Sequence, residues 1–196
     1  MAKQNVLGNK TQTRRPGISK IFDSENLVFS HMEFIEARGK WAAVFEGNGE
    51  RFNCYSDFGG PGDWLWQRET FSNNIDKNKP LYKADVSGLP ENLLSGTKWT
   101  PAIHAPLSSA RAFMLITGVR VERLNKISRQ DALSEGMIEK DGVDAVSAYM
   151  LLWNQLYRQI FPFEANPRVW VITYKAYTRE GFEAKTGQTI KELTTN

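Results

Sequence analysis

The stretch "RAFMLITGVRVERL", residues 111–124, is the longest β-strand pattern in the chain. Its first half is apolar on both faces, and its second half alternates Val119 and Val121 with Arg120 and Glu122. A strand buried on both faces at one end and on one face at the other is expected where a sheet curls toward a barrel. The pattern therefore predicts a central strand in a curved sheet.

Further strand patterns lie on both sides of this segment. They are short apolar and aromatic runs bounded by Gly, Pro, Asn and Asp, as is typical of strands and the turns between them. The runs are "LVFSHMEFI" (27–35) and "KWAAVFEG" (40–47), which read as a hairpin, "DWLWQRETF" (63–71), "LYKADV" (81–86) and "RVWVITYKAY" (168–177). The polar stretch between 48 and 63, "NGERFNCYSDFGGPGD", is expected to be an irregular connection.

Helix patterns are fewer. "SRQDALSEGM" (128–137) has Ser128 as its N-cap and Asp131 three positions later, close to a capping box. Residues 143–160 carry apolar side chains at three- and four-residue spacing, which predicts an amphipathic helix. A short helix over 4–12 is also expected, and the polar tail over 179–196 is expected to add little core. Because strands outnumber helices, the sequence predicts an α+β protein, a small mixed β-barrel with helices at its rim.

Composition limits the function classes. The chain has 196 residues, 41% of them hydrophobic, which favours one domain and leaves room for a small second one. A single cysteine, Cys54, excludes an internal disulfide, and two histidines leave little for a metal site. A net charge of +3 permits a nucleic-acid partner without requiring one. No membrane-length apolar run and no signal-peptide pattern is present, so the protein is expected in the cytoplasm, without a membrane partner.

The segment "GNKTQTRRPG" (8–17) is an unusually dense polar cluster. It combines three cationic side chains with hydroxyl and amide groups, between a glycine and a Pro-Gly pair. Such a run is either a solvated end of the chain or a site for an anionic or nucleophilic reaction partner. The ten residues alone leave both interpretations open.

The order of the motifs is more specific than any one of them. The chain has, in succession, "KTQTRR", "PGDWLWQRETF", "YKAD", "KWTPAIHAP", "ITGVRVERLNKISRQDALSEGM" and "LWNQLYRQIFPFEANPRVWVITYKAY". Over residues 8–177 this succession resembles the ASCH domain, in particular the bacteriophage and prophage branch of that family. The resemblance implies a PUA-like fold: a small mixed β-barrel with peripheral helices, forming one domain over 1–178 with a β-hairpin insertion at about 18–60. It also implies the cytoplasm of a bacterial host cell.

The resemblance also implies a site. Bacterial members of the family that hydrolyse N4-acetylcytidine use a lysine, a threonine three residues later and a glutamate of a short helix, and these match Lys10, Thr13 and Glu135. Lysine can act as a base when its pKa is lowered, threonine as the nucleophile and the carboxylic acid as the proton donor. The three-residue spacing is expected to place Lys10 and Thr13 on one face of a helical turn. No cofactor or metal is implied.

A basic cleft around these groups is expected to receive RNA or a modified nucleoside or nucleotide. Its binding residues are expected to be Arg14, Arg15, Arg68, Glu69 and His104. From the residues alone, His104 can equally pack or cap, and Glu69 can equally pair with the neighbours of Arg68. Three functions remain open: an amidohydrolase acting on an N4-acylated cytidine, a non-catalytic nucleic-acid-binding or phage adaptor protein, and a ribonuclease.

Overall fold

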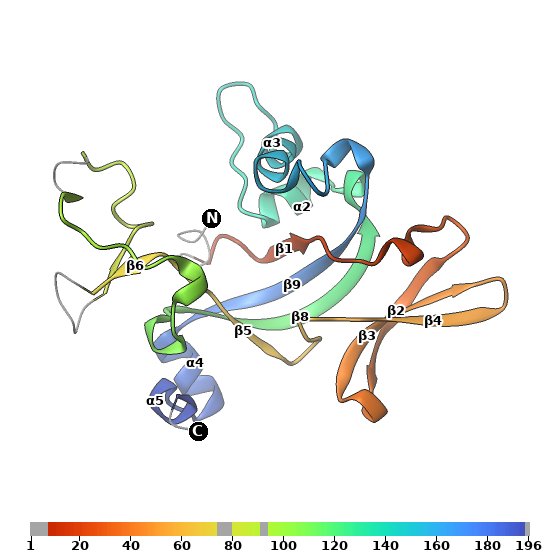
Figure 1. Ribbon diagram of the computed structural model, residues 1–196, viewed down its shortest axis with the longest axis horizontal. Helices are drawn as coiled ribbons and strands as arrows, with labels where there is room; N and C mark the ends of the chain where they lie inside the picture. The colour runs from red at the N-terminus through yellow and green to blue at the C-terminus, as the bar shows by residue number, and fades with distance from the viewer. Residues whose placement is uncertain (1–7, 74–79, 91–93, 195–196) are drawn as a thin grey trace. The chain divides into compact units, whose positions relative to one another are not determined.

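The computed structural model describes residues 8–73, 80–90 and 94–194 (Figure 1). It is a mixed α+β structure in which strands predominate, so the fold class predicted from sequence is confirmed at this level. The chain forms two compact units. The large unit contains Asn9–Trp64 and Leu115–Lys175, and the small unit contains Met1–Gly8, Leu65–Met114 and Ala176–Asn196. The division into a domain over 1–178 and a tail stays a prediction.

The strands form three separate sheets. The largest has the order β1-β9-β8-β5, the second β2-β3-β4 and the third β6-β7. Over the described ranges none of these sheets closes on itself, and the strand order leaves β1 and β5 at the edges of the largest. The strands are β1 (Gln12–Arg15), β2 (Val28–Ile35), β3 (Lys40–Gly47), β4 (Glu50–Tyr55), β5 (Trp64–Trp66), β6 (Phe71–Ser72), β7 (Leu81–Tyr82), β8 (Ala112–Arg123) and β9 (Arg168–Thr178).

Among the described residues, every helix other than α3 is short. The α-helices are α2 (Arg129–Ser134), α3 (Ala145–Tyr157), α4 (Arg179–Thr186) and α5 (Ile190–Leu193). The predicted capping box of α2 is confirmed: the Ser128 side chain accepts from the amide of Asp131, whose carboxylate accepts from the amide of Ser128. Single 3-10 turns occupy Lys20–Asp23, Glu36–Arg38, Ala102–His104, Leu107–Ser109, Leu124–Lys126 and Phe163–Ala165.

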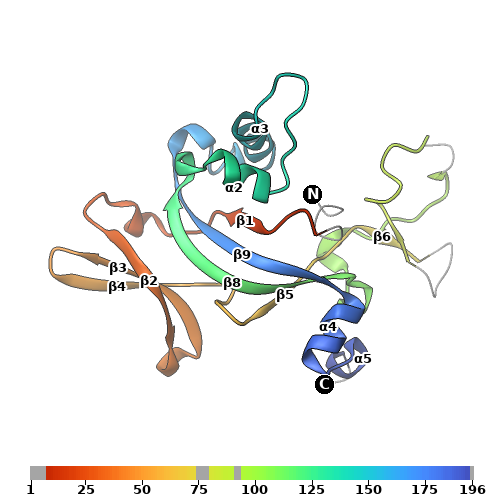
Figure 2. The ribbon, with the colours of Figure 1, turned by 180° about the vertical axis from the view of Figure 1, so that it is seen from behind.

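The core of the large unit lies between α3 and β9. Tyr149 and Trp153 of α3 pack in one buried cluster with Val169 and Val171 of β9. The indole N–H of Trp153 donates to the carbonyl of Phe161 at 2.7 Å, so this large side chain is buried with its polar atom satisfied. Both ribbon views show α2 and α3 on the same side of β1 and β9 (Figures 1 and 2).

The pairing of β1 with β9 decides where the N-terminal side chains point. The strands are antiparallel, with Arg14 opposite Val171 and Thr13 opposite Ile172. Directly opposed residues share a face of a sheet, and successive residues alternate between faces. Because Val171 belongs to the core cluster with α3, Arg14 lies on the face that the helices cover. Thr13 lies on the other face.

Two sequence predictions near the N-terminus are wrong. The short helix predicted over 4–12 falls partly outside the described residues, and from Gln12 onward the chain is strand β1. Lys10 and Thr13 are therefore not held on a helical turn. The polar segment forms an edge strand because pairing with β9 satisfies its main-chain N–H and C=O groups.

A strand was also missed in the segment expected to be an irregular connection. Glu50–Tyr55 forms β4, which pairs with β3 along its whole length. Asn48 and Gly49 join the two strands with φ of 53° and 77°. Two consecutive positive φ angles are characteristic of a tight hairpin turn, for which Asn-Gly is the preferred sequence. Asn48-Gly49 is thus the sequence signal for this hairpin.

The runs predicted over 63–71 and 81–86 are shorter than expected. β5 covers only Trp64–Trp66, β6 begins at Phe71, and β7 covers only Leu81–Tyr82. The tail contributes more to the core than predicted, because Phe182 and Ile190 are both buried. Phe182 stacks on Phe113 with ring centroids 4.4 Å apart. The strands predicted over 27–35, 40–47, 111–124 and 168–177 and the helices over 128–137 and 143–160 are confirmed, with shifted ends.

Candidate functional site

Alternate side chains of β1 and of the residues just before it face helix α2 and its C-cap, Glu135. The Lys10 ammonium lies 3.0 Å from Oε2 of Glu135, and Nε2 of Gln12 donates to Oδ1 of Asp131 at 3.0 Å. Arg14 contacts both carboxylates, Glu135 at 3.5 Å and Asp131 at 3.2 Å. Lys10, Gln12 and Arg14, spaced by two residues, therefore face two carboxylates that are four residues, about one helical turn, apart.

A second strand completes the arrangement. Glu122 of β8 pairs with Arg14 and also accepts from Nε of Arg120 at 3.0 Å. Arg120 reaches Asp131 at 3.3 Å. We call the six charged residues the β1–α2 charge cluster: Lys10, Arg14, Arg120, Glu122, Asp131 and Glu135.

Burial strengthens the electrostatic interactions between the charges of the cluster. Arg14 is 1% exposed, Glu135 2% and Lys10 5%. Charges removed from water are costly unless they are paired, and here three cations face three carboxylates. The cluster is thus close to neutral as a whole, and the Arg14 guanidinium is already committed to carboxylates of the protein.

The environment shifts the protonation equilibria. Burial lowers the pKa of Lys10, and the neighbouring charges of Arg15 and Arg14 act in the same direction, against the attraction of Glu135. Burial alone would raise the pKa of Asp131, but hydrogen bonds from Gln12 and Ser128, with the charge of Arg14, bring it down to about 2. A lysine with a lowered pKa beside a carboxylate is an arrangement suited to proton transfer.

Tyr149 lies beside the same charges. The Arg14 guanidinium lies over its ring, 5.9 Å from the centroid, and the tyrosine belongs to the core of the large unit. Burial, followed by the negative charge of Glu135, raises the pKa of Tyr149. Its phenol therefore stays protonated at neutral pH.

Thr13 is placed differently from the other two predicted catalytic residues. Its side chain lies on the face of β1 opposite Arg14, and its hydroxyl accepts from Nη1 of Arg15 at 2.6 Å. Thr13 itself is 7% exposed, whereas Arg15 is half-buried. The structure thus brings Lys10 and Glu135 together and pairs Thr13 with Arg15.

The remaining predicted site residues lie in the small unit. Arg68 is exposed, donates to the carbonyl of Ile103 at 3.1 Å and lies over the ring of Trp66. His104 is exposed in the 3-10 turn Ala102–His104. A single cleft that unites these residues with Lys10 stays a prediction.

Glu69 has a partner within its own unit. It is 5% exposed, and its two oxygens accept from Nε and Nη2 of Arg111 at 2.7 and 2.8 Å. Arg111 also pairs with Asp85 at 2.6 Å. The partner of Glu69 is therefore Arg111, a residue that the sequence did not single out.

Sequence reasoning missed four members of this network: Gln12, Arg120, Glu122 and Asp131. A usable signal existed for the first, because Lys10, Gln12 and Arg14 repeat with the period of a strand. Asp131 was recognised only as part of a helix cap, a role that it also fills. The partners lie more than 100 residues from β1, so no local pattern links them.

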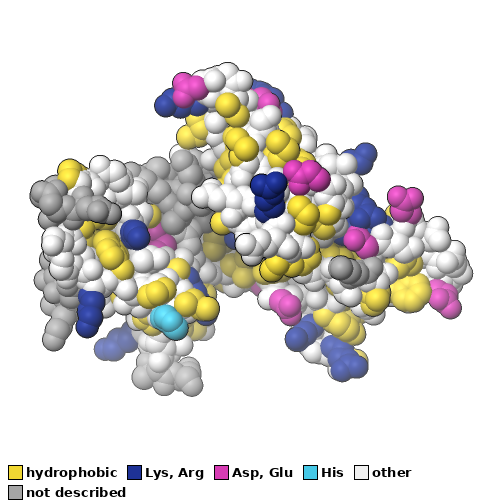
Figure 3. Space-filling model, turned by 45° about the horizontal axis from the view of Figure 1, so that its top comes forward, with side chains coloured by type: hydrophobic (Ala, Val, Ile, Leu, Met, Phe, Trp, Pro, Cys, Tyr) yellow, Lys and Arg dark blue, Asp and Glu magenta, His cyan; other side chains and the backbone are white. Residues whose placement is uncertain are grey.

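One face of the molecule carries charges of both signs. On the face shown in Figure 3, Lys and Arg side chains are scattered among Asp and Glu and do not gather in one patch. In the described part of the chain, no group of three or more His, Cys, Asp or Glu side chains is placed to hold a metal ion. No helix in the described ranges is long and apolar enough to cross a membrane.

Comparison with known proteins finds no relative of this chain. No protein-family model, no curated protein and no solved structure matches this chain. The functional argument therefore rests on the residues and the geometry described above.

Proposed function

We propose that this chain is an ASCH-type protein with a PUA-like fold, that it binds RNA or a modified nucleotide beside β1, and that it hydrolyses the amide of an N4-acylated cytidine. The observation that carries the proposal is the contact between Lys10 and Glu135, which are 3.0 Å apart and almost fully buried. A purely structural ion pair of this kind gains little over apolar packing, so its presence favours a chemical role.

The element order supports the PUA-like part of the proposal. The two longest strands, β8 and β9, are neighbours in one sheet, β1 pairs with β9, and α2 and α3 cover one face. A closed barrel is the finer expectation. Within the described ranges β1 and β5 are the edges of the four-stranded sheet, so a closed barrel would need pairing across these two edges in addition to the pairs observed.

A single proton transfer would prepare both catalytic groups. If the Lys10 ammonium gives a proton to the Glu135 carboxylate, the pair becomes an amine and a carboxylic acid with no change in total charge. Burial lowers the pKa of Lys10, which reduces the cost of releasing its proton. The pair then has the protonation states that a base and an acid need.

The reaction proposed for this pair is acyl transfer followed by hydrolysis. In this structure Thr13 lies on the face of β1 opposite Arg14 and is bonded to Arg15, so the reaction requires its hydroxyl to leave Arg15 and reach the Lys10 amine. The hydroxyl then attacks the acyl carbon as its proton passes to that amine, and the carbon–nitrogen bond breaks as Glu135 protonates the leaving amino group of cytidine. Water then cleaves the ester on Thr13, releasing the carboxylic acid and restoring the hydroxyl. No cofactor enters this sequence.

The decisive experiment is incubation of the protein with N4-acetylcytidine, followed by chromatography of the nucleosides. We expect cytidine and acetate from the wild type, and a loss of about a hundredfold or more in rate for Lys10→Met, Glu135→Gln and Thr13→Ala. Thr117→Ala, an exposed threonine of β8, is the matched control and should keep the wild-type rate. Turnover that survives Thr13→Ala would remove the nucleophile, and no turnover by the wild type would remove the reaction.

A specific observation favours a second candidate, a nucleic-acid-binding protein without catalysis. The Thr13 hydroxyl is engaged by Arg15 and lies on the opposite face from Arg14, which does not resemble an activated nucleophile. Arg15 is half-buried and makes no ion pair with a carboxylate of the described residues, so it is available for a phosphate.

RNA binding distinguishes the two candidates. Affinity for a short single-stranded RNA is measured at several salt concentrations for the wild type, Arg15→Gln and the control Arg158→Gln, an exposed arginine at the end of α3. Loss of one phosphate contact should reduce the salt slope by about 0.7 for Arg15→Gln alone. Binding with that change and no hydrolysis would establish the second candidate. Equal slopes in all three proteins would contradict it, and shortened RNA would indicate a ribonuclease.

A further inference from the structure

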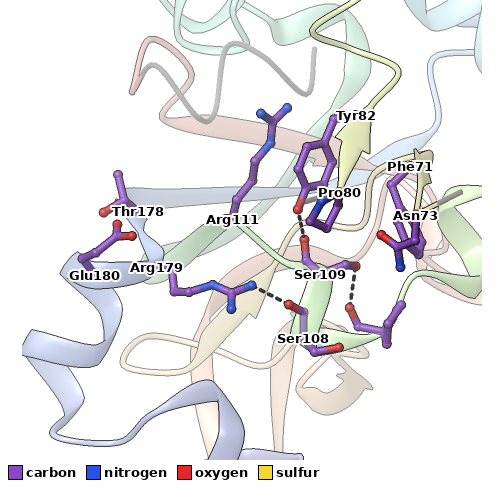
Figure 4. Close-up of a pocket in the computed structure, with 11 residues that line it drawn as sticks. Phe71, Asn73, Pro80, Tyr82, Ser108, Ser109, Arg111, Thr178, Arg179 and Glu180 are labelled. Atoms are coloured by element: carbon purple, nitrogen blue, oxygen red, sulfur yellow. Dashed lines mark hydrogen bonds between the residues drawn. The ribbon is translucent and has the colours of Figure 1, made fainter. Parts of the chain in front are cut away.

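The small unit contains a cavity of about 600 Å³ that the proposed function does not use. Its volume is in the range of small-molecule sites, about 300–1,000 Å³. The described residues that line it all belong to the small unit: they come from the β6–β7 hairpin, the 3-10 turn Leu107–Ser109 and the residues just before it and just before β8, and the start of α4. Figure 4 shows these side chains around the opening.

One side of the cavity is apolar and fixed. Phe71, Pro80, Tyr82 and Pro106 line it. The Tyr82 hydroxyl donates to the carbonyl of Ser109 at 2.6 Å, and the Arg111 guanidinium lies 4.0 Å from the centre of the tyrosine ring. These contacts hold the ring in place, which suits it to pack against a flat ligand.

The other side carries a positioned cation. Nη2 of Arg179 donates to the carbonyls of Ser108 and Ala110 at 2.5 and 2.6 Å, and its Nε donates to Ala110 at 3.2 Å. Within the described ranges Arg179 forms no ion pair with a carboxylate, and its Nη1 has no hydrogen-bond acceptor. Two neutral carbonyls thus fix the guanidinium while its charge and one of its nitrogens remain uncommitted.

Arg111 differs from Arg179 in both respects. Glu69 and Asp85 together occupy Nε, Nη1 and Nη2 of Arg111. Figure 4 shows its guanidinium pointing away from Arg179. The cation available to a ligand in this cavity is therefore Arg179.

A carboxylate beside Arg179 limits the ligand further. Glu180 lines the cavity, and hydrogen bonds from its own amide and from Thr178, with a smaller effect of Arg179, lower its pKa. An ionised Glu180 disfavours a second negative charge nearby and can accept from an N–H donor.

We propose that this cavity binds a small molecule made of a flat, amino-bearing ring and one oxyanion group. The oxyanion, a phosphate or a carboxylate, takes the free Nη1 of Arg179 as its donor. The ring packs on Tyr82 and the neighbouring prolines, with its amino group toward Glu180. This site lies entirely in the small unit and does not depend on the function proposed for the large one.

Calorimetric titration with four probes tests the inference. Adenosine 5′-monophosphate and 4-aminobenzoate carry both features with different oxyanions, whereas adenosine lacks the oxyanion and inorganic phosphate lacks the ring. We expect at least one of the first two to bind measurably, and both single-feature probes to bind about tenfold more weakly or not at all. Which of the two binds identifies the source of the oxyanion.

Two variants assign the binding to this cavity. Arg179→Gln removes the cation and should weaken binding about tenfold or more. Ser108→Trp fills the opening while leaving the main-chain carbonyl that holds Arg179, so it should block binding even if the first variant is unstable. Arg158→Gln is the control and should match the wild type, and circular dichroism checks that each variant is folded.

Three results would overturn the inference: binding of neither composite probe, wild-type affinity in folded Ser108→Trp, or binding lost in Lys10→Met and kept in Arg179→Gln. The last would place the ligand in the large unit and would support the function proposed there. Failure of N4-acetylcytidine hydrolysis has no bearing on this site, so the two proposals fail separately.

Discussion

The ammonium nitrogen of Lys10 lies 3.0 Å from a carboxylate oxygen of Glu135, 125 residues further along the chain. Glu135 also faces Arg14, so removal of Lys10 leaves the carboxylate with one weaker partner at 3.5 Å. Breaking a buried pair is expensive because the remaining charge loses its compensation. We expect Lys10→Met and Glu135→Gln each to lower the free energy of unfolding by about 2–4 kcal/mol in urea titrations.

The double variant should cost less than the sum of the two single variants, by about 1 kcal/mol or more. The matched control is the exposed pair of Arg129 and Glu139, whose oxygen and nitrogen are 2.5 Å apart. Its coupling energy should stay below about 1 kcal/mol because water screens it. Equal coupling in the two pairs would show that burial does not strengthen the Lys10–Glu135 contact.

Asp131 should make the protein sensitive to acid. Its pKa in the folded protein is about 2, below the ordinary value of 3.8. The folded state therefore holds the proton less tightly, so the stabilisation is present above about pH 4 and is lost as the pH falls toward 2. After allowance for solvent screening, Asp131→Asn should cost about 1 kcal/mol at pH 7, and the difference from wild type should shrink at pH 3.

Asp141→Asn is the control, because Asp141 is exposed and its position has a φ of 55° that asparagine also tolerates. Urea titrations at both pH values should give this variant the wild-type stability. A constant difference between Asp131→Asn and wild type at pH 7 and pH 3 would contradict the assigned pKa.

The long elements of the fold could be predicted because their patterns are long. β8, β9 and α3 each repeat their apolar positions over eleven or more residues. β1 could not, because it is four polar residues that become a strand only through pairing with β9. Local propensity is a weak guide where a partner strand decides the conformation.

The candidate site, too, could be predicted from the sequence only in part. The sequence alone marked the cluster at 8–17 as polar, and the family resemblance connected Lys10 with Glu135. Neither source indicated that Arg14 would be buried against three carboxylates, since those partners come from β8 and α2. Charge pairing between distant segments depends on the fold. In this fold the Arg14 guanidinium is paired with three carboxylates of the protein itself.

Glu69 and Asp85 offer a matched pair for testing a buried ion pair in the small unit. Both contact Arg111, but the Glu69 side chain is 3% exposed and that of Asp85 is 42% exposed. Glu69→Gln should lower the free energy of unfolding by about 2–3 kcal/mol, because it removes a bidentate buried carboxylate. Asp85→Asn should cost less than about 1 kcal/mol. Equal losses in thermal or urea unfolding would contradict a structural role for Glu69.

The N-cap of α2 should control both stability and the geometry of the charge cluster. Ser128 begins the helix by accepting from the amide of Asp131, and its hydroxyl donates to the Asp131 carboxylate. Ser128→Ala should cost about 1 kcal/mol, the usual value for losing a serine cap. Because α2 has only six residues and Glu135 is its C-cap, fraying at its start should also loosen the contact with Lys10.

Hydrogen exchange gives the local readout for this variant. Ser128→Ala should speed exchange of the amides of Ala132 and Glu135, which bond to the carbonyls of Ser128 and Asp131. Ser95→Ala, an exposed serine of the small unit, is the control and should leave these amides as slow as in the wild type. If the amides of α2 exchange equally fast in both variants, the cap does not hold Glu135 in place.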